Sequence, residues 1–150
     1  MTNPVMTATA LERHYEVGGG LFRKPQTLKA VGGVEFELFP GKTLAVVGES
    51  GCGKSTLARM VTMIEAPTAG SLMLEDTAVI PDNWASLRES VQIVFQDPYG
   101  SLNPRQRIGA ILEEPLKINR PDLSAADRTA KAREMLGLVG LGPEHLGRYP

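Results

Sequence analysis

Apolar and polar residues alternate in the first third of the chain. Within residues 28–39, apolar residues alternate with glutamates, which predicts a strand buried on one face. A shorter strand is expected within residues 11–17, ending at Tyr15. The small and polar residues before it are expected to fray.

Two later runs are apolar without alternation. Residues 43–47 and 91–95 are rich in β-branched and aliphatic side chains, as in strands that are covered on both faces. A short strand is also expected over residues 71–74. Such runs favour a sheet whose central strands are parallel and buried.

Between and after these runs, apolar residues recur at the spacing of a helix, and residues typical of helix ends stand beside them. Ser124, with Asp127 three residues later, is a typical N-cap pair, and Gly137 is expected to end the helix that it starts. Pro115 is expected to stop the preceding helix. Strands that alternate with helices predict an α/β fold with a largely parallel sheet. The expected helices cover residues 54–64, 84–89 and 108–113, and run from Ser124 to Leu136.

Composition narrows the functional classes. The 150 residues are 42% hydrophobic and 22% charged, which suits one globular domain and excludes a disordered or fibrous chain. A net charge of −1 argues against a protein that binds nucleic acid through bulk positive charge. Cys52 is the only cysteine, so no internal disulfide can form. No apolar run approaches membrane-spanning length and the first residues do not form a secretory signal, so a cytosolic chain is expected.

The strongest chemical signal lies between the first apolar run and the first predicted helix. Residues 48–56 read GESGCGKST, which satisfies the phosphate-loop pattern in its required strand–turn–helix context. Glycines let the backbone curve around a polyphosphate, and the helix N-terminus adds unpaired N–H donors. Lys54 can contact the β- and γ-phosphates, Ser55 can bind Mg²⁺, and Thr56 offers another donor. The glycine spacing differs from that of dinucleotide-binding folds.

A phosphate loop does not define the reaction, because kinases, GTPases, helicases and transport ATPases share it. Gln96 follows the second apolar run and begins a proline- and glycine-rich loop. A glutamine at the end of a strand can reach Mg²⁺ or an attacking water beside the phosphates. From its position alone, Gln96 could equally be a residue that caps a turn.

The two motifs together resemble those of one family. Residues 48–56, followed about 40 residues later by VFQDP at 94–98, resemble the Walker A motif and Q-loop of ATP-binding cassette (ABC) ATPases. A narrower resemblance is to the ATPase subunits of dipeptide and oligopeptide importers, a group that also serves nickel and glutathione uptake. It rests on residues 101–105, 112–116 and 147–150, with the loop 18–27 resembling the subunit often called F-type.

The resemblance implies a P-loop NTPase (RecA-like) core with an N-terminal antiparallel β subdomain and the start of a helical subdomain, all within one ABC domain. Residues 1–96 would form the core and residues 97–150 the Q-loop and the helical part. Implied ligands are ATP and Mg²⁺, with Gln96 placing water or Mg²⁺ and coupling the site to the membrane subunits. Tyr15 would stack on adenine, although an ordinary edge-strand tyrosine is the alternative. The residues implied to contact nucleotide are Tyr15, Gly48, Glu49, Ser50, Gly51, Cys52, Gly53, Lys54, Ser55 and Thr56, with Ser55 and Gln96 on the metal.

The implied function is to bind and, in the complete protein, hydrolyse ATP to energise peptide import. Partners would be a second ATPase subunit, transmembrane permease subunits and indirectly a peptide-binding protein, at the cytoplasmic face of the cell membrane and without nucleic acid. The family's signature motif, Walker B aspartate and catalytic glutamate are not in these 150 residues. This chain alone is therefore expected to bind MgATP weakly and not to hydrolyse it.

Other functions stay open from the sequence. They are a nucleotide-binding fragment without catalysis, the ATPase of a nickel or glutathione importer, an ABC exporter or DNA-repair ATPase, and a small P-loop kinase. The family's Walker B strand lies beside its Walker A strand in the core sheet. Without that strand, the runs 43–47 and 91–95 are expected to expose unpaired edges.

Overall fold

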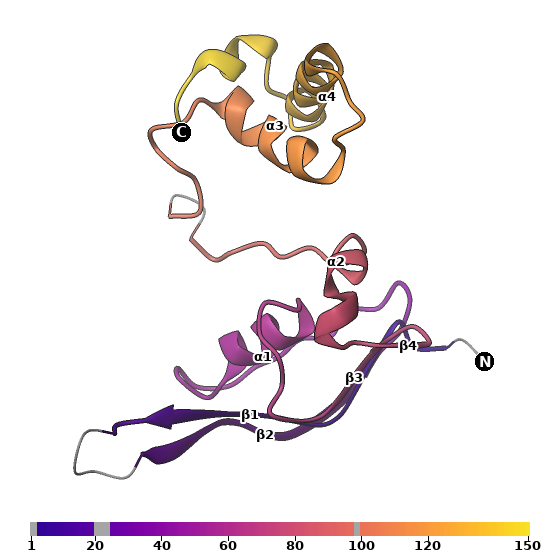
Figure 1. Ribbon diagram of the computed structural model, residues 1–150, viewed down its shortest axis with the longest axis vertical. Helices are drawn as coiled ribbons and strands as arrows, with labels where there is room; N and C mark the ends of the chain where they lie inside the picture. Colours follow the sequence, from indigo (N-terminus) through magenta and orange to yellow (C-terminus); the bar gives the residue numbers. More distant parts are fainter. Residues whose placement is uncertain (1–2, 20–24, 98–99) are drawn as a thin grey trace. The chain divides into compact units, whose positions relative to one another are not determined.

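A four-stranded antiparallel sheet forms the base of the first of two units (Figure 1). The computed structural model describes residues 3–19, 25–97 and 100–150, and it divides into unit 1 (residues 1–93) and unit 2 (residues 94–150). The strand order is β2–β1–β3–β4. The predicted N-terminal antiparallel β subdomain is thus confirmed. The strands are β1 (Met6–Val17), β2 (Gln26–Leu38), β3 (Ala69–Leu74) and β4 (Thr77–Ala78).

The first strand begins earlier than the sequence predicts. β1 starts at Met6, and the side chains of Met6 and Ala8 are buried, so the expected fraying of the first ten residues is wrong for this part. Ala10 has a positive φ of 46°, at a point where the register with β2 shifts. This bulge puts Leu11 in the core with no exposed surface, which interrupts the simple alternation that a strand would show.

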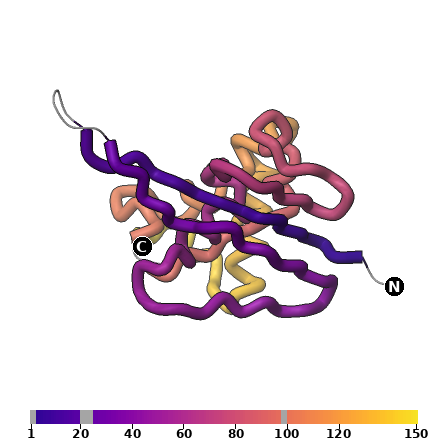
Figure 2. Tube along the Cα trace, turned by 90° about the horizontal axis from the view of Figure 1, so that it is seen from below, coloured from indigo at the N-terminus to yellow at the C-terminus, as the bar shows by residue number. Residues whose placement is uncertain are grey.

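One helix, α1 (Lys54–Val61), covers a face of the sheet. Figure 2 follows the long β1–β2 pair from indigo to purple, with β1 in the middle of the sheet between β2 and β3. The helix is shorter than the predicted 54–64, because turns follow Val61. The buried side chains of Leu57 and Met60 on its apolar face help to stabilise unit 1. The core cluster consists of Met6, Ala8, Leu11, Val31, Leu57, Met60 and Leu72.

The predicted strands at residues 43–47 and 91–95 do not form, and neither does the expected parallel sheet. Every strand pairing in the described residues is antiparallel, and both runs lack regular structure. Val47 is 87% exposed and Val94 is 95% exposed. An apolar run becomes a strand only when a neighbouring strand accepts its backbone hydrogen bonds, and the described part of the chain offers these runs no such partner.

Helices make up most of unit 2. The last two helices of unit 1 are η1 (Pro81–Asn83) and α2 (Trp84–Leu87). Unit 2 contains α3 (Ile108–Asn119), α4 (Ala125–Leu138) and η2 (Pro143–Gly147). α3 continues through Pro115, so the predicted stop before this proline is wrong. Contacts of α3 with both α4 and η2 outweigh the backbone hydrogen bond that proline cannot donate. Among the described residues, no helix has the length and apolar character needed to cross a membrane.

The start of α4 confirms the predicted cap. The backbone N–H of Asp127 donates to Ser124 Oγ at 3.2 Å, and the N–H of Ser124 donates back to the Asp127 carboxylate at 3.2 Å. The Ser124 hydroxyl also donates to this carboxylate and lowers the pKa of Asp127. The predicted end of α4 at Gly137 is not where the helix ends, because Gly137 lies inside it. Gly140, with a left-handed φ of 76°, follows the end of the helix instead.

This capping box makes a testable contribution to stability. Ser124→Ala is expected to lower the free energy of unfolding by about 1 kcal/mol, because the N–H of Asp127 loses its acceptor. Urea unfolding followed by circular dichroism measures the change. Ser124→Thr keeps the hydroxyl and should stay close to the wild type, so equal losses in the two variants would contradict the role of the cap.

Candidate nucleotide-binding site

The predicted phosphate loop leads directly into α1. Gly53 is the N-cap of the helix, with φ 99°, and a Cβ at this position would lie 2.2 Å from the carbonyl oxygen of Ala30 on β2. Both the left-handed backbone and this close approach require glycine. Gly51 also has a left-handed φ of 81°, but a Cβ there would meet open space. The loop is therefore fixed to the sheet at Gly53 and open to solvent before it.

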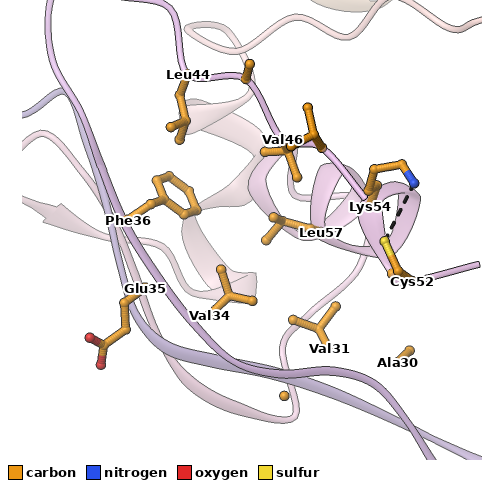
Figure 3. Close-up of a pocket in the computed structure, with 14 residues that line it drawn as sticks. Ala30, Val31, Val34, Glu35, Phe36, Leu44, Val46, Cys52, Lys54 and Leu57 are labelled. Atoms are coloured by element: carbon orange, nitrogen blue, oxygen red, sulfur yellow. Dashed lines mark hydrogen bonds between the residues drawn. The ribbon is translucent and has the colours of Figure 1, made fainter. Parts of the chain in front are cut away.

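Lys54 bends back over the loop. Its Nζ donates to the carbonyl oxygens of Gly48 at 2.8 Å and Glu49 at 2.5 Å, and it lies 3.6 Å from Cys52 Sγ (Figure 3). No carboxylate is among these recorded acceptors. The ammonium group is thus held at the mouth of the loop by neutral acceptors, which an incoming phosphate oxygen can replace as a stronger, charged partner.

The N-terminus of α1 presents the remaining donors. In the described residues, no side chain caps this helix and no acidic residue lies in its first turn. Its N–H groups and the positive end of its dipole therefore suit an anion. The Ser55 side chain is exposed and that of Thr56 is half-buried, while Glu49, Ser50 and Cys52 are exposed along the loop.

The geometry fits a magnesium-bound polyphosphate better than a metal held by the protein alone. Ser55 offers a single hydroxyl ligand, as expected when phosphates and waters supply the other ligands of Mg²⁺. Within the described residues, no group of three or more histidine, cysteine or acidic side chains could hold a metal ion. Any metal at this site would therefore depend on the phosphates for binding.

An apolar hollow of about 450 Å³ lies beside the loop. Figure 3 shows Val34 and Phe36 of β2 and Leu57 of α1 facing it, while Glu35 points away. Leu44 and Val46 from the unpaired run 43–47 line its other side. Lys54 and Cys52 lie at its edge, so the phosphate loop rests on an apolar base rather than a charged one.

Tyr15 lies near the end of β1, opposite Leu28 of β2. Its hydroxyl donates to Glu65 Oε2 at 2.8 Å, and the guanidinium carbon of Arg13 lies 4.8 Å from the centre of its ring. Sequence reasoning missed Glu65 and Arg13 because Glu65 lies 50 residues from Tyr15 in the chain. The only local signal for the contact between Arg13 and Tyr15 was their separation by two positions on a strand, which places both side chains on the same face.

Gln96 belongs to unit 2, whereas the phosphate loop belongs to unit 1. The side chain of Gln96 is exposed, and it lines a surface hollow with Phe95, Asp97, Gly100 and Ser101. It does not end a strand, because residues 91–95 are not one. The N–H of Gly100 donates to Asp97 Oδ1 at 3.1 Å, which joins the residue after Gln96 to Gly100. Residues 98 and 99 of the predicted Q-loop lie outside the described residues.

The family can be assigned from the sequence as a whole. The pattern of the family described as ABC transporter matches residues 31–150. The chain belongs to the ABC transporter family. This assignment confirms the predicted ABC family.

The chain is similar to ATP-binding proteins of peptide transporters within the ABC family. The chain is 56% identical over 149 residues to the di/tripeptide transport ATP-binding protein DppF of Pseudomonas aeruginosa, covering 97% of this chain. It is 51% identical over 153 residues to the dipeptide transport ATP-binding protein DppF of Escherichia coli, covering all of this chain. In both cases the chain spans 46% of the relative's length.

A solved ABC structure has the same fold. The dimeric post-hydrolysis structure of the ATP-binding cassette MJ0796, bound to ADP and Pi, matches with a TM-score of 0.75. The match covers 97% of this chain and 61% of that chain, at 21% sequence identity. At this identity the likeness establishes the ABC cassette fold, of which the present chain contains part.

Proposed function

We propose that this chain is the nucleotide-binding part of an ATPase subunit that energises peptide import. The observation that carries the proposal is the phosphate loop, in which Lys54 crosses the loop and the N-terminus of α1 has no side-chain cap in the described residues. The names of the two DppF relatives support peptides as the cargo, and hydrolysis is proposed for the complete protein.

In this proposal each part of the loop has one task. Backbone N–H groups from residues 48–56 surround the phosphates, and Lys54 balances the charge of the β- and γ-phosphates. Ser55 would hold Mg²⁺ through its hydroxyl, with Gln96 as a second candidate ligand. Bound Mg²⁺ supplies charge stabilisation to the phosphates. Tyr15 would stack on adenine through the ring face that Arg13 does not cover.

Gln96 is proposed to couple nucleotide binding to transport. Gln96→Ala is expected to leave MgATP affinity within about twofold of wild type, because an uncharged ligand contributes little to ground-state affinity. The same variant is expected to lower transport-coupled hydrolysis about tenfold or more, because the amide positions the reacting groups. Equilibrium nucleotide binding and peptide-stimulated ATPase activity measure the two effects. Gln92→Ala removes the same amide from an exposed position nearby and serves as the control. A pure loss of ATP affinity in Gln96→Ala would contradict the coupling role.

The proposed partners are a second ATPase subunit and the transmembrane permease subunits, with a peptide-binding protein acting through the permease. The proposed location is the cytoplasmic face of the cell membrane, and no nucleic acid is involved. Residues 1–96 are proposed to be the core part and residues 97–150 the Q-loop and helical part of a single ABC domain. The match of one family pattern across both units supports this single-domain reading.

Peptide uptake by cells tests the function. The gene is deleted from its host, and uptake of a labelled dipeptide is compared with uptake of nickel and of glutathione. Loss of dipeptide uptake alone, restored by the wild-type gene and not by Lys54→Ala, would support the proposal. Loss of nickel or glutathione uptake instead would assign the ATPase to a different importer. Normal uptake of all three would overturn the proposal.

A further inference from the structure

Glu65 follows α1 and contacts two side chains of β1 with separate oxygens. The Tyr15 hydroxyl donates to Oε2 at 2.8 Å, whereas Arg13 donates to Oε1 from Nε at 2.8 Å and lies 2.7 Å from it through Nη2. The side chains of Arg13 and Glu65 are only 25% and 17% exposed. Because each carboxylate oxygen has its own partner, the hydroxyl end of Tyr15 is fixed in place.

Arg13 contacts both Glu65 and the ring of Tyr15. Its guanidinium carbon lies 4.8 Å from the centre of the Tyr15 ring, within the range of a cation–π contact. One face of the ring is therefore covered by a planar group that is itself held by Glu65. A flat base can stack only on the opposite face.

The strand that carries the ring is also held to the segment after α1. The N–H of His14 donates to Thr68 Oγ1 at 3.0 Å, and the N–H of Thr68 donates to the carbonyl oxygen of Glu12 at 2.8 Å. Tyr15 pairs with Leu28, two residues along β2 from Ala30, whose carbonyl oxygen meets Gly53. Two strand residues span about 7 Å, so the ring and the phosphate loop are attached to the same short stretch of sheet.

We propose that Glu65 and Arg13 are positioning residues for the nucleobase, which hold the Tyr15 ring so that one face is presented to adenine. This inference rests on the proposed function, because it extends the adenine-stacking role of Tyr15. Glu65 fixes the hydroxyl end of the ring, and Arg13 supports the face away from the base. The ring then does not have to be ordered when the nucleotide binds, which removes part of the cost of binding.

Comparing two ligands tests the proposal in the protein expressed from its complete gene. MgATP carries the base, whereas magnesium tripolyphosphate offers the phosphates alone. Tyr15→Phe removes the hydroxyl–carboxylate bond, and Glu65→Gln replaces its charged acceptor by a neutral amide. Each is expected to weaken MgATP binding by about three- to tenfold, which corresponds to a typical net hydrogen-bond contribution of about 1 kcal/mol. Affinity for tripolyphosphate should stay within about twofold. The double variant should lose less than the sum of the two single losses, because both variants disturb the Tyr15–Glu65 hydrogen bond, whereas Glu65→Gln also weakens the ion pair with Arg13.

The alternative outcomes separate this inference from the proposed function. Glu37→Gln, an exposed glutamate on β2, is the matched control. Equal losses for both ligands in Glu65→Gln would assign Glu65 a purely structural role and overturn the inference. Unchanged MgATP affinity in both Glu65→Gln and Tyr15→Phe would also overturn it. If the wild-type protein does not bind MgATP, or Lys54→Ala binds it equally well, the proposed function itself fails.

Discussion

Replacing Lys54 by alanine is expected to weaken MgATP binding by about 100-fold or more, equivalent to roughly 2.8 kcal/mol. The wild-type ammonium is held at the mouth of the loop by the carbonyl oxygens of Gly48 and Glu49, and it can move to the phosphates without losing an ion pair. The variant leaves several phosphate charges without a cationic partner. Isothermal titration or a fluorescent ATP analogue measures the change.

A lysine outside the loop controls for the loss of charge. Lys42→Ala makes the same substitution at an exposed position before the run 43–47 and should keep wild-type affinity within about twofold. If both lysine variants lose affinity equally, net charge rather than the loop determines binding. If Lys54→Ala binds as tightly as wild type, its assigned contact with the phosphates is wrong.

Replacing Gly53 by alanine is expected to destabilise unit 1 by about 3 to 5 kcal/mol and to abolish tight nucleotide binding. The new Cβ would lie 2.2 Å from the carbonyl oxygen of Ala30 and 3.4 Å from a methyl group of Val31, in a left-handed backbone conformation. The Ala30 carbonyl belongs to the backbone of β2, so it cannot give way as the end of a flexible side chain could. Denaturant unfolding and nucleotide binding measure the two losses.

Gly51→Ala serves as a control that separates the two effects in Gly53→Ala, the clash with β2 and the strain of a left-handed backbone. Gly51 has a similar left-handed φ of 81°, but its Cβ would have no atom within 4 Å. Its cost should be limited to about 1 kcal/mol from the backbone conformation. Equal destabilisation in the two variants would show that the contact between the loop and β2 contributes nothing.

Local signals in the sequence predicted much of the fold. The N-cap at Ser124 depends on two side chains three residues apart, and the phosphate loop depends on glycines next to a helix start. Alternation also predicted β2 to within two residues at its start. These features are set by neighbours in the chain, so a single sequence contains the information that specifies them.

Features that depend on distant partners were predicted poorly. The run 43–47 has the composition of a central strand, but strand formation needs a second strand to accept its hydrogen bonds. α3 continues through Pro115 because of contacts with α4 and η2 that no local pattern reveals. The contacts of Glu65 with β1 were missed for the same reason. The roles of Gln96 and Tyr15 in catalysis and binding stay predictions.

The contacts between Glu65 and β1 also affect the order of events during folding. They join residues that are 50 and 52 positions apart, so their formation closes a long loop of chain, at an entropic cost that local contacts avoid. During synthesis, β1 emerges from the ribosome well before Glu65. The ring of Tyr15 therefore reaches its final position only after β2, the phosphate loop and α1 have all been made.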